Sequence, residues 1–212
     1  SLEPLRGLPL TMLNCGGNCI SSLDPLKGMP LTWLGCWGNR VGSLDPVAGT
    51  RLTALYCDAN EIPSLKPLKG MPLTTLHCNG NRIKTLTDVS ELPLTTLHCG
   101  CNELRDLEPL RGLRLTIFSC HCNQIKSLAP LKGMPLGSLY CGGNQLVGIE
   151  SFIKNPPESM MFDCDTISTE ELTWIQQTWS RDFRKAVHAR NVEVLLAARK
   201  GDADRLRSLA RE

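Results

Sequence analysis

A 21-residue pattern repeats seven times along this chain, and it constrains the fold more than any other feature. The first copy, Leu10 to Ile20, reads L-x-x-L-x-C-x-x-N-x-I. Later copies allow Ile, Leu or Val at the last position and follow without insertion at 31–41, 52–62, 73–83, 94–104, 115–125 and 136–146. A fixed period of about 20 to 50 residues is typical of solenoids, in which each repeat packs only against its neighbours.

The alternation of residue types within each copy predicts which side chains are buried. Side chains of a strand point alternately to its two faces. Leu13 and Cys15, with their equivalents, are therefore expected to point inward. Met12, Asn14 and Gly16, with their equivalents, are expected on the opposite side, which we call the concave face. The asparagine column from Asn18 to Asn144 follows each strand and is expected to satisfy backbone groups of the turns, with no ligand role.

The second half of each repeat reads S-L-x-P-L-K-G-M-P and predicts a short 3₁₀ turn. Leu23 and Leu26 are three residues apart, as a 3₁₀ turn requires. Pro25 suits the start of such a turn, because its missing N–H is not needed there. Gly28 and Pro30 are expected to end the turn before the next strand.

These features resemble the leucine-rich repeat, and the wording P-L-K-G-M-P-L-T-x-L-x-C is similar to internalin-type and related bacterial arrays. Some such arrays belong to large bacterial proteins that carry a serine/threonine kinase domain elsewhere. The resemblance covers residues 1–150 and implies an α/β leucine-rich repeat solenoid. Its parallel sheet would lie on the concave face, and 3₁₀ or irregular segments on the convex side. It also implies binding by the concave face and no catalytic residue.

The regular pattern ends near residue 150, and residues 151–212 are predicted to form a degenerate repeat followed by an α-helical C-terminal cap. The segment 160–164 has the character of a last, degenerate strand. Ser168 and Glu171 form a capping box, and apolar residues follow at helical spacing: Leu172, Ile175, Trp179, Phe183, Ala186 and Val187. Since the end of a solenoid exposes its core, these helices are expected to cover it.

Eleven cysteines would suggest a disulfide scaffold in a small secreted chain, but most of them share one column here. A buried free cysteine behaves as a small hydrophobe. We therefore expect a ladder of inert, reduced core thiols and, from that, a cytoplasmic location. The members are Cys15, Cys36, Cys57, Cys78, Cys99, Cys120 and Cys141.

The net charge of +2 gives the molecule no strong attraction to nucleic acid or to a membrane surface, and no apolar run is long enough for a transmembrane helix. A basic row with gaps is expected to be a solvated convex face: Arg6, Lys27, Lys69, Arg111 and Lys132.

Residues 1–9 match the second half of a repeat. We therefore expect the chain to be a fragment of a longer protein, monomeric as a fragment.

The concave face carries the candidate binding residues, because its positions are not needed to build the core. Strand propensity alone explains some aromatic residues, but tryptophan and tyrosine are also enriched at protein interfaces. We predict a protein or peptide partner held near the second to fourth repeats. The candidates are Trp33, Trp37, Tyr56, Asp58, His77, Asn79, His98, His121 and Tyr140, and Ile117 lies on the same face. Four of them share one column of the repeat: Tyr56, His77, His98 and Tyr140.

Cys101 and Cys122 form a second constellation, because they occupy equivalent positions where the other repeats have Gly or Ala. With His98 and His121 they have the residue types of a tetrahedral zinc site. A disulfide between them, or two small residues filling a tight turn, are the alternatives.

No phosphate-binding, zinc-protease or nucleophile-elbow motif is present, and the sequence predicts neither an enzyme nor a cofactor. The predicted function is a non-enzymatic binding scaffold. The alternatives are a structural spacer in a larger chain and a metal- or redox-responsive element around Cys101 and Cys122.

Overall fold

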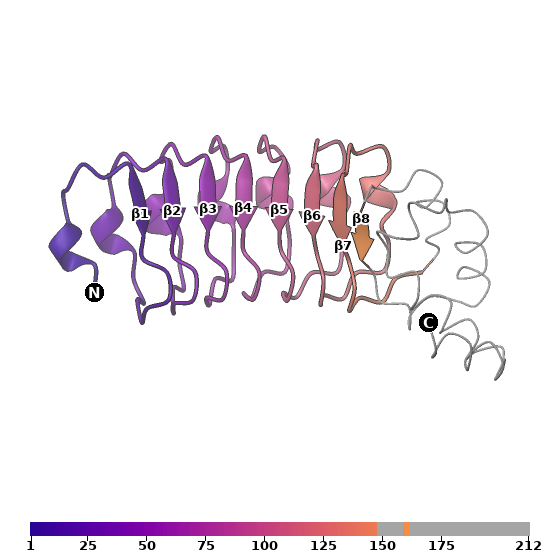
Figure 1. Ribbon diagram of the computed structural model, residues 1–212, viewed down its shortest axis with the longest axis horizontal. Coiled ribbons are helices and arrows are strands. Elements are labelled where there is room, and N and C mark those ends of the chain that lie inside the picture. Colours follow the sequence, from indigo (N-terminus) through magenta and orange to yellow (C-terminus); the bar gives the residue numbers. More distant parts are fainter. Residues whose placement is uncertain (148–158, 162–212) are drawn as a thin grey trace, which may run out of the picture.

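The computed structural model describes residues 1–147 and 159–161, and it is an open stack of parallel strands with 3₁₀ turns on the opposite side (Figure 1). The sheet follows chain order from β1 to β8. Its strands are β1 (Met12–Asn14), β2 (Trp33–Gly35), β3 (Ala54–Tyr56), β4 (Thr75–His77), β5 (Thr96–His98), β6 (Ile117–Ser119), β7 (Ser138–Tyr140) and β8 (Ser159–Met161). A leucine-rich repeat solenoid is therefore confirmed.

The register of the sheet follows the repeat without slippage. Leu13 pairs with Leu34, and Leu34 with Leu55, so each side chain stacks on its equivalent 21 residues away. The same step carries Ser138 onto Ser159, so β8 begins one residue before the degenerate strand predicted at 160–164.

The predicted capping box and helical cap lie outside the described residues. No helix in the described part of the chain is long and apolar enough to cross a membrane.

Within residues 1–147, seven 3₁₀ turns occupy the second halves of the repeats, as predicted from the leucine and proline spacing. They are η1 (Glu3–Leu5), η2 (Asp24–Leu26), η3 (Asp45–Val47), η4 (Lys66–Leu68), η5 (Thr87–Val89), η6 (Glu108–Leu110) and η7 (Ala129–Leu131). Proline stands at the start of each turn except η5, where Asp88 replaces it. The turn still forms there. It ends differently, because Ser90 has helical dihedral angles where the other repeats are extended.

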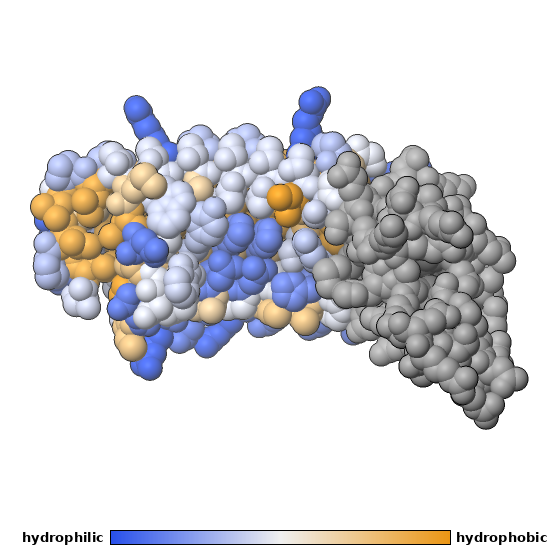
Figure 2. Space-filling model, in the orientation of Figure 1, coloured by the Kyte–Doolittle hydropathy of each residue, from blue (hydrophilic) through white to orange (hydrophobic). Residues whose placement is uncertain are grey.

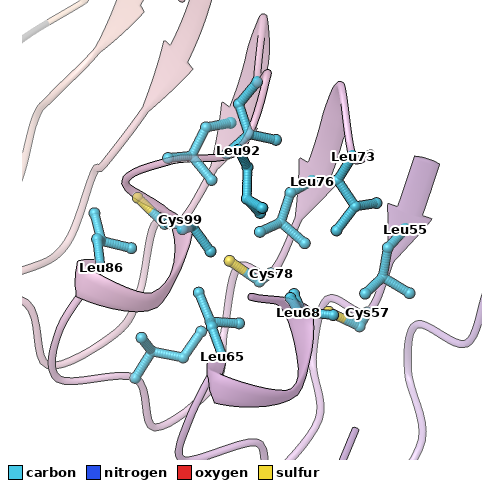
Figure 3. Packing of buried hydrophobic residues seen from close by; sticks show 14 of the residues in the cluster. Leu55, Cys57, Leu65, Leu68, Leu73, Leu76, Cys78, Leu86, Leu92 and Cys99 are labelled. Carbon is cyan, nitrogen blue, oxygen red and sulfur yellow. The ribbon is translucent and has the colours of Figure 1, made fainter. Parts of the chain in front are cut away.

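The core lies between the sheet and the turns and consists of leucine columns with a cysteine column among them (Figure 3). The inward placement of the cysteines is confirmed, since Cys36, Cys57 and Cys78 have no exposed surface. Removal from water disfavours a thiolate. Burial raises the pKa of Cys36 to about 12 and that of Cys78 well above the ordinary thiol value. All seven members of the column are free thiols.

The asparagine column connects successive repeats through its side-chain amides. The Asn81 Nδ2 donates to the carbonyl oxygens of Cys57, Cys78 and Asn79 at 3.0–3.2 Å. Its Oδ1 accepts the N–H of Ile62 at 3.0 Å. One amide therefore satisfies backbone groups of two repeats, which confirms the structural asparagine ladder. It also explains why this position requires both a donor and an acceptor.

Candidate binding face

The concave face carries a continuous row of stacked rings from four successive repeats, which we call the ring stack. Its members are Trp33, Tyr56, His77 and His98. The ring centroids of Trp33 and Tyr56 are 5.4 Å apart, those of Tyr56 and His77 are 4.6 Å apart, and those of His77 and His98 are 4.0 Å apart. The two imidazoles are nearly parallel, with an interplanar angle of 8°.

Strand register explains most of the ring stack. Tyr56 pairs with His77 and His77 with His98, so their rings share one column, as the sequence predicted. Trp33 comes from a different column, two residues earlier in its strand. It reaches the row because Gly35 leaves the equivalent place empty. A Cβ on Gly35 would lie 2.7 Å from the Trp33 ring.

Partial burial shapes the electrostatics of the two stacked histidines. Loss of hydration lowers the pKa of His77, and the nearby Asp58 carboxylate opposes that shift. Loss of hydration also lowers the pKa of His98, and the neighbouring His77 and His121 lower it further against the effect of Asp58. Both imidazoles therefore favour the neutral form in the folded protein.

A second row follows immediately after the strands, and its first large side chain is Trp37. Its indole lies over the backbone of Gly16 and Gly17, where a Cβ on Gly16 would approach within 2.3 Å of the ring. Trp37 as a whole keeps 46% of its surface exposed. Trp37 is therefore a flat apolar platform beside the ring stack, with one side fixed on glycine backbone.

Asp58 and Asn79 continue this row and link three repeats. The Asp58 Oδ1 accepts hydrogen bonds from the backbone N–H and the Nδ2 of Asn79, at 2.9 and 2.7 Å. The Asn79 Oδ1 accepts the N–H of Gly100 at 2.7 Å. These two candidates therefore brace the face as well as presenting polar atoms beside the rings, a role that the sequence analysis did not predict.

The remaining candidates lie toward the C-terminal end of the described face. His121 folds over Gly100, and its Nδ1 is 2.8 Å from the Ser119 Oγ. Tyr140 shares the column of the ring stack, but Ser119 stands between it and His98 in the register. Tyr140 is therefore separate from the stack, although the sequence placed it correctly in the column.

The zinc hypothesis is not supported, because the four candidate ligands do not converge. His98 stacks on His77, while His121 is held by Gly100 and Ser119. Within residues 1–147 and 159–161, no group of three or more His, Cys, Asp or Glu side chains is placed to hold a metal ion. Cys101 and Cys122 remain as a pair without a third ligand beside them.

Sequence reasoning missed the glycines that seat the large side chains of this face. Gly16, Gly35 and Gly100 each lie under a ring from the same or the next repeat. The sequence did contain a signal for these seats. Gly16 and Trp37 occupy equivalent positions in successive repeats, so a glycine in one repeat is followed by a large residue in the next. Figure 2 shows that hydrophilic residues gather in the middle of this face and that apolar residues lie at the N-terminal end of the molecule.

No protein-family model matches the chain, and no curated protein matches it. Among solved structures, internalin C2 from Listeria monocytogenes has a TM-score of 0.66 at 26% identity, covering 72% of this chain and 71% of that chain. A leucine-rich repeat protein from Leptospira interrogans has a TM-score of 0.68 at 25% identity, covering 79% of this chain and 46% of that one.

The functional domain of InlJ from Listeria monocytogenes includes a cysteine ladder. It has a TM-score of 0.50 at 24% identity, covering 75% of this chain and 45% of that chain. The chain thus spans less than half of two of these three neighbours. The resemblance to internalins and other bacterial leucine-rich repeat proteins is therefore confirmed.

Proposed function

We propose that this internalin-like bacterial leucine-rich repeat protein is a non-enzymatic scaffold that binds a protein or peptide along the ring stack. The observation that carries the proposal is the stacking of four rings from four successive repeats, half-buried yet open on one side. Nothing in the packing of the core requires these rings, because the leucine and cysteine columns fill the other face of the sheet.

The ring stack combines a large contact area with a rigid frame. Aromatic side chains with a polar tip provide large contact areas and a hydrogen-bonding group, and they dominate interface hot spots. Here each ring is held by a regular strand and by the next ring. Ordering these side chains on binding therefore costs little conformational entropy. Asp58 and Asn79 fix the polar edge of the same surface.

The proposal is tested by selecting peptides from a random library on the immobilised full chain and then measuring their affinity for variants. Tyr56→Ala interrupts the stack at its second ring and is expected to weaken binding by about thirtyfold, which corresponds to ~2 kcal/mol. Trp33→Ala and Trp37→Ala are expected to act similarly. Each variant should retain the thermal stability of the parent, because the rings lie outside the core.

Tyr140→Ala is the matched control, since it removes the same side chain from the same column outside the stack. Its effect on affinity should be much smaller. Gly35→Ala tests the arrangement without removing a ring, because the added methyl displaces Trp33 from its place against Tyr56. Weaker binding by Gly35→Ala would show that the stacked geometry matters.

Two outcomes would contradict the proposal. If the chain is a structural spacer, the selected peptides bind elsewhere. The variants Tyr56→Ala, Trp33→Ala, Trp37→Ala and Gly35→Ala then all keep the parent affinity. A glycan-binding face predicts that simple sugars displace the selected peptides at the tryptophans, and a sugar competition assay detects this.

A further inference from the structure

The residue three positions after each strand adopts a left-handed backbone in all seven complete repeats. Its φ lies between 49° and 68°. Glycine adopts this conformation readily, whereas other residues are strained in it. Four of the seven positions are glycine, and the others are Ala59, Cys101 and Cys122. In the described part of the chain these three are the only non-glycine residues with positive φ. Two of the strained positions are therefore cysteines, and they lie in adjacent repeats.

The backbone places Cys101 and Cys122 directly beside each other. The Cys101 N–H donates to the His121 carbonyl at 2.7 Å, and the Cys122 N–H donates to the Gly142 carbonyl at 2.8 Å. The equivalent pair at Ala59 and Gly80 measures the separation, because a Cβ on Gly80 would lie 4.0 Å from the Ala59 Cβ. A disulfide requires Cβ atoms about 3.5–4.5 Å apart, so this column has the spacing of a disulfide.

The two thiols are accessible, unlike those of the buried ladder. Both Cys101 and Cys122 are exposed, whereas Cys99 and Cys120 in the same two repeats are buried. Desolvation and a hydrogen bond with Cys122 raise the pKa of the Cys101 thiol. Cys101 therefore favours its protonated form, with the Cys122 sulfur within hydrogen-bonding reach.

We propose that Cys101 and Cys122 form a redox-active dithiol that closes to an intramolecular disulfide by exchange with a low-molecular-weight disulfide. The Cys122 thiolate attacks one sulfur of the small disulfide, forming a mixed disulfide and releasing one small thiolate, which takes up a proton. Cys101 then loses its proton and attacks the Cys122 sulfur, and the second small thiol leaves. Two electrons pass from the protein to the small disulfide, which is reduced to two thiols.

The full chain is incubated with oxidised glutathione, the remaining thiols are alkylated, and the protein is analysed by mass spectrometry and peptide mapping. The expected product is a monomer with a cross-link between the peptides of Cys101 and Cys122 and a mass lower by two hydrogens at that pair. Cys101→Ser and Cys122→Ser should abolish the cross-link and leave a stable glutathione adduct on the remaining cysteine. Adding dithiothreitol should restore both thiols.

Cys19 is the internal control, because it is exposed and has no cysteine in the adjacent repeat at its position. It should form only a mixed disulfide with glutathione. Separate glutathione adducts on Cys101 and Cys122 in the parent protein, without a cross-link, would overturn the proposal. So would a cross-link found only between two molecules. Neither result depends on the proposed function of the ring stack, since the peptide affinities are measured on fully reduced protein.

Discussion

At the level of single residues, the position of each cysteine sulfur determines whether the thiol packs in the core or is accessible for reaction. The Cys78 sulfur is fully buried, and its Sγ is 3.3 Å from the His98 carbonyl oxygen. Its environment is otherwise apolar and disfavours any charge. The thiols of this column are therefore packing groups, whereas Cys101 and Cys122, on the surface of the same solenoid, are free to react.

Cys78→Asp is expected to destabilise the fold severely, by about 4 kcal/mol or more, because it buries a carboxyl group without a charged partner. Cys78→Ala provides the comparison and should cost only about 1–2 kcal/mol, for a small cavity. Urea denaturation followed by circular dichroism measures both. Equal losses for the two variants would mean that the site is hydrated rather than dry.

Ala59 carries backbone strain that a glycine would relieve. Its φ of 49° is left-handed, in a column where glycine is otherwise common. Ala59→Gly is expected to raise the unfolding free energy by about 0.5–1 kcal/mol, despite the greater freedom of glycine in the unfolded chain. Ala48→Gly is the matched control, because Ala48 is exposed with a φ of −58°. That change should destabilise the protein, and urea midpoints should move in opposite directions.

At the level of the secondary-structure elements, the asparagine side chains connect one turn to the next. Asn81→Ala removes three donated hydrogen bonds and one accepted hydrogen bond from a buried site. The loss should be about 3 kcal/mol or more, because buried backbone groups then lack partners. Asn18→Ala should cost less than about 1 kcal/mol, since Asn18 is exposed and donates only to Cys15 and Gly16. Thermal denaturation of the two variants tests the difference.

Pairing of β4 with β5 places the imidazoles of His77 and His98 side by side, and we expect the ring stack to be sensitive to pH for that reason. The pKa of His77 and that of His98 are both lowered by folding, mainly through desolvation. The unfolded chain therefore binds more protons near the ordinary histidine pKa of about 6.5. The stabilising contribution is complete above that pH and is lost as the pH falls through it toward the folded-state pKa values.

Acidification from about pH 7.5 to 5 is accordingly expected to lower the melting temperature and to weaken peptide binding at the stack. His77→Asn and His98→Gln should reduce the pH dependence of both quantities over that interval. Calorimetry and affinity titration across the interval measure the effect. If a variant that carries both changes has a melting temperature as sensitive to pH as that of the parent protein, other titratable groups cause the effect.

At the level of the whole molecule, stability accumulates from contacts between neighbouring repeats, because the strands and turns of the described residues make their main contacts with the equivalent elements of the next repeat. The end of such a stack exposes core residues unless it is covered. We propose that residues 162–212 supply this cover. Deleting them after Met161 should broaden the urea transition or cause aggregation, which light scattering detects. A soluble truncation with an unchanged transition would instead make the segment an independent arm.

Much of this architecture is determined by the sequence alone. An uninterrupted 21-residue period fixes the register of the strands, and the alternation of Leu34 and Cys36 with Trp33 and Trp37 fixes the face to which each side chain points. These properties are local, since each repeat makes the same contacts as the next. The inward cysteine column, the 3₁₀ turns and the asparagine ladder were predictable for that reason.

Only the tertiary structure decided which side chains meet on the concave face. Trp33 reaches Tyr56 because Gly35 has no side chain and leaves room for the Trp33 ring, and Tyr140 is separated from the stack because Ser119 interrupts the row. The tertiary structure likewise decided that His98, His121 and the two surface cysteines, all within the described residues, form no group of three or more able to hold a metal ion. Such contacts depend on the particular residues of neighbouring repeats, and no period in the sequence specifies them.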